Sequence, residues 1–259
     1  MDINILIQGG VNVNQALELL GDMETYNETL QDFLNEIDEK LKKIKEYKES
    51  QDMENYSILV HSLKSDSKYL GFTALADLAY NHEMASKARD VRFVIGSYDA
   101  LINEANRILG VLRSYVSGNK APSVTLVSNN QGANKILVAD DSNIIRNFVQ
   151  KMIPENYSVV VATDGEEAIK IITEEAINLK GVLLDLNMPK VDGFQVLEFF
   201  RANNLFANVP VTIITGDDSK DTVMKAFDYP IVDVLNKPFT ENDVRNVVTK
   251  MMNFSSNKQ

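Results

Sequence analysis

Five polar residues in the C-terminal half of the chain have the types and spacing needed to hold a phosphoryl group. Each follows a short run of Val, Ile and Leu residues, and together they are Asp140, Asp141, Asp185, Thr215 and Lys237. Three carboxylates held close together repel one another unless a cation lies between them. Hard oxygen ligands at an open site suit Mg²⁺, which keeps several waters and accepts phosphate oxygens as ligands. These residues therefore predict a metal-assisted phosphoryl site with Asp185 as the nucleophile.

The N-terminal half offers a second nucleophile, His61, in the segment His61-Ser-Leu-Lys-Ser65. An imidazole titrates near neutral pH and can attack phosphorus. At about 100° per residue, Tyr56, Leu59 and Leu63 fall within one arc of a helix and His61 lies nearly opposite. We therefore expect His61 to be exposed in mid-helix, with Lys64 on the same face to attract a phosphoryl group.

Each of these residues also has an ordinary structural interpretation. A surface helix commonly carries a histidine, an acid at a strand end commonly caps a helix, and a lone lysine is usually solvated. What favours chemistry is that these five residues follow four separate predicted strands, each in the expected place. The other histidine, His82, shares a helical face with Leu75, Leu78 and Ala79, so we predict that it is buried and structural.

The elements that must position the C-terminal residues alternate between strand and helix. Strands that are apolar throughout are typical of a parallel sheet covered by helices on both faces. In such a sheet the carboxyl ends of the strands meet at one edge, where ligands bind. The expected strands are 135–139, 158–162, 181–184, 211–215 and 231–235, with helices beginning at Ser142, Asp164, Asp192, Asp217 and Thr240.

The N-terminal half shows helical periodicity only. Apolar residues recur every three or four positions between charged residues, so long helices should pack stripe against stripe as a bundle. The expected helices are 12–20, 22–49, 51–70, 73–89 and 91–116. We expect a helical bundle at 1–118, a linker rich in Gly, Asn and Ser at 119–133, and a doubly wound α/β domain at 134–255. Residues 124–127, within that linker, could form a short strand but more simply form an extended tether.

Composition narrows the possible functions. The chain has 259 residues, a net charge of −11 and no cysteine. Such an acidic chain is not expected to bind nucleic acid, because phosphate contacts need a basic surface. The lack of cysteine excludes a thiol nucleophile and fits a reducing cytoplasm. There is no apolar run of about 20 residues and no signal peptide, so we expect a cytoplasmic protein without direct membrane insertion.

The C-terminal motifs resemble those of response-regulator receiver domains. The matching segments are Asp140-Asp141, Asp185-Leu-Asn-Met-Pro-Lys-Val-Asp-Gly193, Thr215-Gly216 and Lys237-Pro238. The resemblance implies that Asp185 accepts the phosphoryl group and that Asp140, Asp141, Asp185 and the backbone carbonyl of Asn187 hold Mg²⁺. Thr215 and Lys237 would contact the phosphoryl oxygens, and a cis bond before Pro238 would aim Lys237 into the site. Val234 stands where receivers often carry a switch aromatic residue.

The segment from His61 to Gly71 resembles the signature of histidine phosphotransfer (HPt) domains, with Lys64 three residues after the histidine. Ser65 replaces the glycine that the family usually has four residues after it. The resemblance implies that His61 is the phosphohistidine and that Lys64 assists. Ser65 is small enough to leave a partner surface close access.

Together the two resemblances predict a two-component phosphorelay intermediate that carries phosphoryl groups on His61 and Asp185. An alternative is a binding module switched by Asp185 alone. A metal-dependent phosphohydrolase of related fold is disfavoured, since it needs an acid at position 187, where the chain has Asn187. Expected partners are a sensor histidine kinase and other receiver or phosphotransfer domains. Whether the chain counts as an enzyme stays open, because it shows no kinase nucleotide loop, although the receiver could catalyse its own phosphorylation and dephosphorylation.

Overall fold

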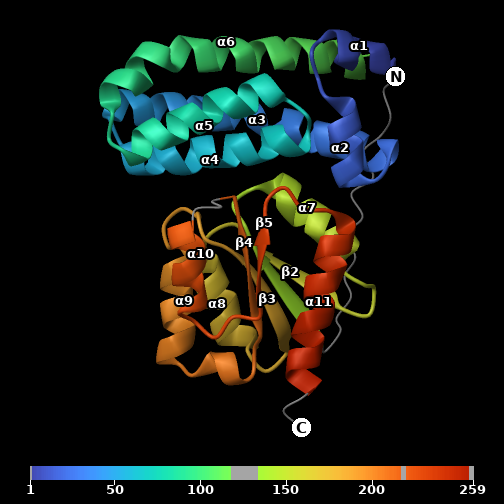
Figure 1. The fold of residues 1–259 in the computed structure, drawn as a ribbon, viewed down its shortest axis with the longest axis vertical. Coiled ribbons are helices and arrows are strands. Elements are labelled where there is room, and N and C mark those ends of the chain that lie inside the picture. The colour runs from blue at the N-terminus through green and yellow to red at the C-terminus, as the bar shows by residue number, and fades with distance from the viewer. Residues whose placement is uncertain (1, 118–133, 217–219, 257–259) are drawn as a thin grey trace. The chain divides into compact units, whose positions relative to one another are not determined.

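The structure is a computed structural model that describes residues 2–117, 134–216 and 220–256. It divides into two compact units, Met1–Ser128 and Asn129–Gln259. Both units are drawn in Figure 1. The expected linker at 119–133, with its tether or strand at 124–127, lies outside the described residues. Within the described segments, no helix is both long enough and apolar enough to cross a bilayer.

The first unit is entirely helical in its described part, as the periodicity predicts. Its helices are α1 (Ile3–Gln8), α2 (Val13–Leu20), α3 (Met23–Ser50), α4 (Met53–Tyr69), α5 (Thr73–Lys87) and α6 (Val91–Val116). Three aspartates fix where long helices begin: the side chains of Asp22, Asp52 and Asp90 each accept a hydrogen bond from a backbone N–H in the first turn. Helix α1 was not predicted, because six residues are too few to display helical periodicity.

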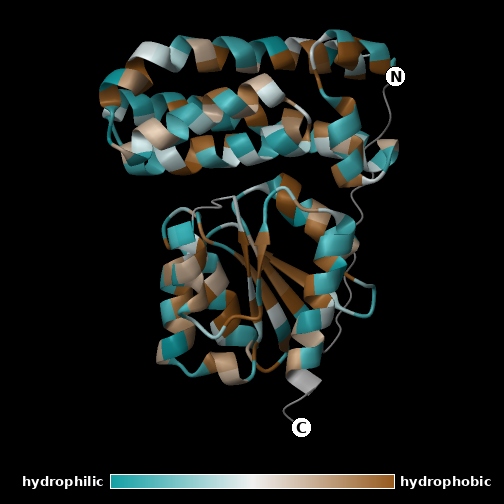
Figure 2. Cartoon of the chain, in the orientation of Figure 1, coloured by the Kyte–Doolittle hydropathy of each residue, from teal (hydrophilic) through white to brown (hydrophobic). Residues whose placement is uncertain are grey.

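The apolar residues of the helical unit pack inward. Figure 2 shows these brown residues alternating with teal hydrophilic ones along the helices. Buried side chains include Leu30 and Phe33 of α3, Tyr56 of α4, and Leu101 and Leu112 of α6. The end of α4 needs a glycine. Gly71 has φ +74°, and a Cβ there would lie 2.3 Å from the backbone oxygen of Asn12, the N-cap of α2. The close approach to Asn12 explains why the HPt-like motif ends in a glycine at position 71.

The second unit is a five-stranded parallel sheet in the order β2-β1-β3-β4-β5. Its strands are β1 (Lys135–Ala139), β2 (Ser158–Ala162), β3 (Leu179–Asp185), β4 (Val211–Thr215) and β5 (Asp233–Asn236). Its helices are α7 (Asn143–Met152), α8 (Gly165–Glu175), α9 (Gly193–Ala202), α10 (Lys220–Phe227) and α11 (Glu241–Ser256). Helices α7 and α11 cover one face of the sheet, and α8, α9 and α10 cover the other (Figure 1). The fold class predicted from the sequence is confirmed for both units.

Differences from the expected elements are small and have local causes. Strand β3 begins at Leu179, two residues before the predicted start, and ends at Asp185, one residue after the predicted end. Strand β5 begins at Asp233 rather than at 231. A 3₁₀ helix, Leu205–Ala207, was missed because three residues carry no period. The predicted start of α10 at residue 217 lies outside the described residues. The predicted N-cap Asp164 is confirmed, since its side chain accepts from the backbone N–H of Glu167.

Candidate functional site

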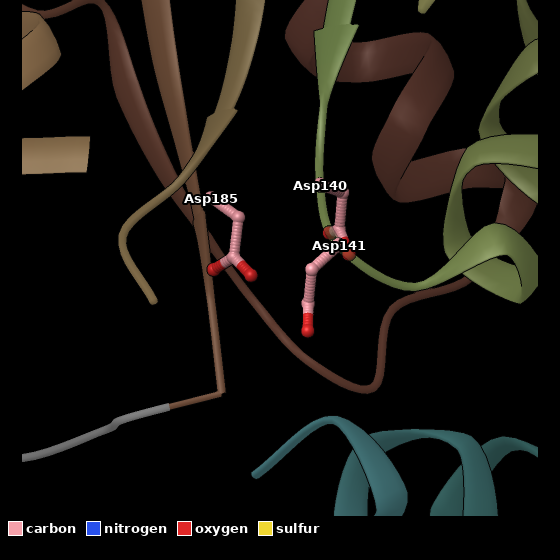
Figure 3. A group of neighbouring side chains, drawn as sticks. All are labelled: Asp140, Asp141 and Asp185. Carbon is pink, nitrogen blue, oxygen red and sulfur yellow. The ribbon is translucent and has the colours of Figure 1, made fainter. Parts of the chain in front are cut away.

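The three acids of the C-terminal half meet at the carboxyl edge of the sheet. Asp140 and Asp141 follow β1, and Asp185 is the last residue of the neighbouring strand β3. One oxygen from each carboxylate can be chosen so that all three lie within 4.8 Å of one another. Figure 3 shows the three side chains gathered in this way. Asp140 and Asp185 are fully buried, whereas Asp141 is partly exposed, so the cluster opens on the side of Asp141.

Lys237 provides the positive charge of this cluster. The Lys237–Pro238 bond is cis, as predicted. The Lys237 ammonium lies 2.7 Å from Asp140 Oδ2 and 3.1 Å from Asp185 Oδ2. The backbone N–H of Lys237 donates to the carbonyl oxygen of Thr215 at 2.7 Å, so the end of β4 and the residue that follows β5 are tied together. All five sequence-predicted polar residues therefore lie at one edge of one sheet.

The electrostatics of the cluster show a shortage of positive charge. Burial raises the pKa of Asp140 to about 6; Lys237 opposes the shift and the charge on Asp185 adds to it. Burial alone would lower the pKa of Lys237, but the charges of Asp140, Asp185 and Asp141 outweigh burial and raise that pKa above its usual value. Three carboxylates and one ammonium leave a net negative site that a divalent cation would relieve.

The loop after β3 is shaped by close backbone packing. The backbone N–H of Asn187 donates to Asp185 Oδ1 at 3.4 Å, which is long for a hydrogen bond. A Cβ at Gly193 would lie 2.2 Å from the backbone oxygen of Asp185, so only glycine fits where α9 begins beside the end of β3. The oxygen-rich donor set fits Mg²⁺. The metal role of the Asn187 carbonyl stays a prediction.

The structure places His61 on α4 beside α5, and its Nδ1 lies 2.7 Å from Oε1 of Glu83. Its exposed fraction in the whole chain is 1%. The exposure of the imidazole on the helical unit by itself stays a prediction. The polar face of α4 has partners on two neighbouring helices of that unit. Lys40 of α3 pairs with Asp66 of α4, while Glu83 of α5 reaches His61.

Glu83 is the functional residue that the sequence reasoning missed. Its carboxylate contacts three groups: His61 Nδ1, the Lys64 ammonium at 2.6 Å and the Lys87 ammonium at 2.8 Å. Burial would raise the pKa of Glu83, but hydrogen bonds and charges from His61 and Lys64 outweigh it and hold the pKa well below its usual range. The sequence does show an acid, Glu83, on the predicted helix that follows the one with His61. Its contact with the histidine could not be predicted, because it depends on how α4 and α5 pack.

The ionised Glu83 fixes which imidazole nitrogen can react. A carboxylate only accepts hydrogen bonds, so the 2.7 Å contact requires His61 Nδ1 to carry the proton. In the neutral ring the lone pair then lies on Nε2, which is therefore the more nucleophilic nitrogen. Burial lowers the pKa of Lys64, with Glu83 opposing. For the pKa of Lys64, the loss of hydration on burial therefore outweighs the attraction of Glu83.

His82, the neighbour of Glu83, is structural as predicted. Its exposed fraction is 1%, its Nδ1 lies 2.7 Å from the Tyr56 hydroxyl, and its Nε2 lies 3.1 Å from Ser97 Oγ. The Ser97 hydroxyl donates to the Phe93 carbonyl at 2.6 Å. Because that hydroxyl has one proton, Nε2–H of His82 must donate to Ser97 Oγ, and Nδ1 accepts from Tyr56. Both ring nitrogens are therefore used within the core.

The chain departs from the two family patterns at Ser65 and at Val234. Ser65 lies on α4, one turn after His61, and is buried. Val234 lies in β5 opposite Ile213 of β4 and is partly buried against the core of the second unit. The consequences of both departures for docking and switching stay predictions.

The comparisons with known proteins agree with the two units. Residues 28–111 match the family described as Hpt domain, and residues 136–249 match the family described as response regulator receiver domain. The hybrid signal transduction histidine kinase D of Dictyostelium discoideum is 27% identical over 124 residues, covering 48% of this chain and 8% of that protein. The probable transcriptional regulator ycf27 of Porphyridium aerugineum is 34% identical over 128 residues, covering 48% of this chain and 51% of that protein.

Among solved structures, the receiver (REC) domain of AraT, a response regulator from Geobacillus stearothermophilus, is 30% identical. It covers 49% of this chain and 98% of its own, with a TM-score of 0.44. The matched part of this chain thus spans about half or less of the length of the curated relatives described above. From the two family matches and the geometry of the two units, the chain consists of an Hpt domain followed by a response regulator receiver domain.

Proposed function

We propose that the chain is a phosphorelay intermediate that carries phosphoryl groups on Asp185 and on His61. The observation that carries the proposal is that one chain holds both kinds of acceptor site. One is a carboxylate cluster with a buried lysine, and the other is an imidazole held by a carboxylate that two lysines also contact. The partners would be a sensor histidine kinase and other receiver or phosphotransfer domains.

In the receiver, an oxygen of Asp185 attacks the phosphorus of the donor, and the donor leaves with the electrons of the broken bond. Lys237 is already 3.1 Å from Asp185 Oδ2 and donates to a phosphoryl oxygen as negative charge grows there. The Thr215 hydroxyl, at the end of the adjacent strand β4, is the second donor. Mg²⁺, held by Asp140, Asp141, Asp185 and the Asn187 carbonyl, would offset the carboxylate charges and bind a phosphoryl oxygen.

In the Hpt domain, Nε2 of His61 attacks phosphorus and the acyl-phosphate bond breaks, returning Asp185 to a carboxylate. The ring then carries the phosphoryl group on Nε2 and the original proton on Nδ1, so it gains positive charge. Glu83 accepts the Nδ1 hydrogen bond and stabilises that charge. Lys64 and Lys87, which lie on the same carboxylate, supply positive charge for the phosphoryl oxygens.

The test is to label the full chain with radioactive acetyl phosphate in Mg²⁺ and to measure the acid and base stability of the product. An acyl phosphate is base-labile and a phosphohistidine is acid-labile, so the wild type should yield both kinds of label. Asp185→Asn should lose both, and His61→Gln should keep only the base-labile label. Asp233→Asn, which changes an acid paired with Lys250 outside the site, is the matched control and should label normally.

Two outcomes contradict the proposal. If Asp185→Asn still takes up label, or if EDTA leaves labelling unchanged, the metal-assisted role of Asp185 is wrong. If the wild type and His61→Gln give the same base-labile product and no acid-labile one, the chain is a switch that uses Asp185 alone.

A further inference from the structure

Arg146 on α7 holds the turn that carries the two acids. Strand β1 ends at Ala139, Asp140 and Asp141 follow, and Ser142 caps α7 by accepting from the backbone N–H of Ile145. From the second turn of α7 the Arg146 guanidinium reaches back, and its Nη1 donates to the backbone carbonyl of Asp140 at 2.6 Å. The side chain is 9% exposed, which is unusual for an arginine.

The partners of this guanidinium are oxygens without formal charge. Besides the Asp140 carbonyl, the Arg146 Nη2 lies 3.4 Å from Asn143 Oδ1, which is a weak contact. Among the described residues, the acidic cluster beside it pairs with Lys237 instead. The geometry of Arg146 is therefore that of a clamp on a peptide group rather than that of a counter-ion.

The clamp acts on the turn together with a second hydrogen bond. Asp140 Oδ1 accepts from the backbone N–H of Ser142 at 2.9 Å, which fixes the side chain of Asp140. Arg146 fixes the carbonyl of the peptide that joins Asp140 to Asp141. The orientation of that peptide sets the direction in which Asp141 leaves the backbone.

We propose that Arg146 is a positioning residue for the divalent cation, because it fixes the peptide between Asp140 and Asp141 so that both carboxylates face the metal. The inference rests on the proposed function for the identity of the cation and deepens it at the same site. Arg146 does not touch the reacting atoms.

The sign of the effect separates positioning from simple electrostatics. Arg146 is a positive charge beside a cation site, so Coulomb repulsion alone predicts that its removal strengthens Mg²⁺ binding. If the clamp matters, its removal lets the turn relax and weakens Mg²⁺ binding. Loss of a group that orients a metal ligand typically costs about 10-fold or more in affinity. The two explanations thus predict opposite changes in the Mg²⁺ dissociation constant.

The experiment is a Mg²⁺ titration of the full chain, followed by the amide NMR shifts of residues after β1 and β3. Arg146→Met should raise the dissociation constant by about 10-fold. Arg146→Lys keeps the charge but loses the planar fork, so it should raise the constant by a smaller factor, about threefold. The matched control is Arg245→Met on α11, which loses only an exposed pair with Glu241 and should bind Mg²⁺ as the wild type does.

A dissociation constant that stays the same or falls in Arg146→Met overturns the inference and leaves the relay proposal intact. If Arg146→Met does not fold, Arg146→Lys tests the inference instead. A raised Mg²⁺ dissociation constant in Arg146→Lys supports the positioning role, and an unchanged constant overturns it. Conversely, weaker Mg²⁺ binding in Arg146→Met, together with a wild type that never labels His61, supports the clamp and contradicts the relay.

Discussion

The histidine site and the aspartate site have opposite charge arrangements. At His61, one carboxylate, Glu83, contacts the imidazole and two ammonium groups. At Asp185, three carboxylates surround one buried ammonium, Lys237. A phosphoryl group brings about two negative charges. The first site has positive charge to receive it, whereas the second lacks positive charge and needs a divalent cation. Phosphorylation of Asp185 should therefore depend on the metal, and phosphohistidine should persist without it.

The largest effect is expected from Glu83→Gln, which neutralises the carboxylate that contacts His61 Nδ1 at 2.7 Å. The neutral amide still accepts a hydrogen bond, but it neither stabilises the charge gained by the ring nor offsets Lys64 and Lys87. We expect phosphoryl transfer to His61 to slow by about 100-fold or more, as when an orienting carboxylate is neutralised elsewhere. Single-turnover transfer from a phosphorylated receiver measures this rate.

The control for that prediction is Glu104→Gln, which loses an ion pair with Arg107 on α6. It should transfer at the wild-type rate. NMR of the phosphorylated wild type should place the phosphoryl group on Nε2. A phosphoryl group on Nδ1, or normal transfer in Glu83→Gln, would contradict the assigned tautomer.

The next effect concerns transfer between the two domains of one molecule. Because the two domains belong to one chain, each is expected to be present to the other at an effective concentration of about millimolar. A mixture of His61→Gln and Asp185→Asn proteins must transfer between molecules. At low micromolar concentration we expect the mixture to label its histidine about 10- to 100-fold more slowly than the wild type. An equal rate means that each domain serves a separate partner.

Lys64→Ala should have a smaller effect. The Lys64 ammonium lies 3.4 Å from His61 Nδ1 and 2.6 Å from Glu83 Oε2, so it belongs to the site that would receive the phosphoryl group. Because Lys87 contacts the same carboxylate, we expect only about a 5- to 10-fold slower transfer, typical of one lost charged contact. Lys45→Ala, an exposed residue of α3 paired with Glu49, is the matched control. A wild-type rate in Lys64→Ala would leave Lys87 as the only assisting cation.

The two sites also differ in how far the sequence could predict them. In the receiver, Asp140, Asp185, Thr215 and Lys237 follow strand ends, and a parallel sheet must bring strand ends to one edge. Topology alone therefore places these residues together. In the Hpt domain, the contact between His61 and Glu83 depends on the rotation of two packed helices. A small error in helical phase moves a residue from solvent to a neighbouring helix, so the candidate histidine could be predicted from the sequence but its carboxylate partner could not.

The smallest expected effect is on stability, and it should have opposite signs in the two domains. Burial lowers the pKa of His82, and Tyr56 and Ser97 already use both ring nitrogens of the neutral form. Below about pH 6.5 the unfolded chain binds a proton at His82 that the folded Hpt domain does not bind. The stability of the Hpt domain therefore falls as the pH is lowered. For Asp140, burial raises the folded pKa to about 6, well above the ordinary value of an aspartate. The folded receiver therefore binds the extra proton, and its stability rises as pH falls through 6 in the absence of metal.

Amide hydrogen exchange, corrected for the intrinsic effect of pH, reads the two domains separately. Between pH 7 and 5.5, the helices α4 and α5 should lose about 1 kcal/mol of protection through His82, because one differential proton is worth about 1.4 kcal/mol per pH unit. Strands β1 and β3 should gain protection through Asp140. His82→Gln should flatten the first trend and Asp140→Asn the second, each without changing the other. Parallel trends in both domains would show that neither buried group controls the acid response, and the contrast between the two sites would then not extend to stability.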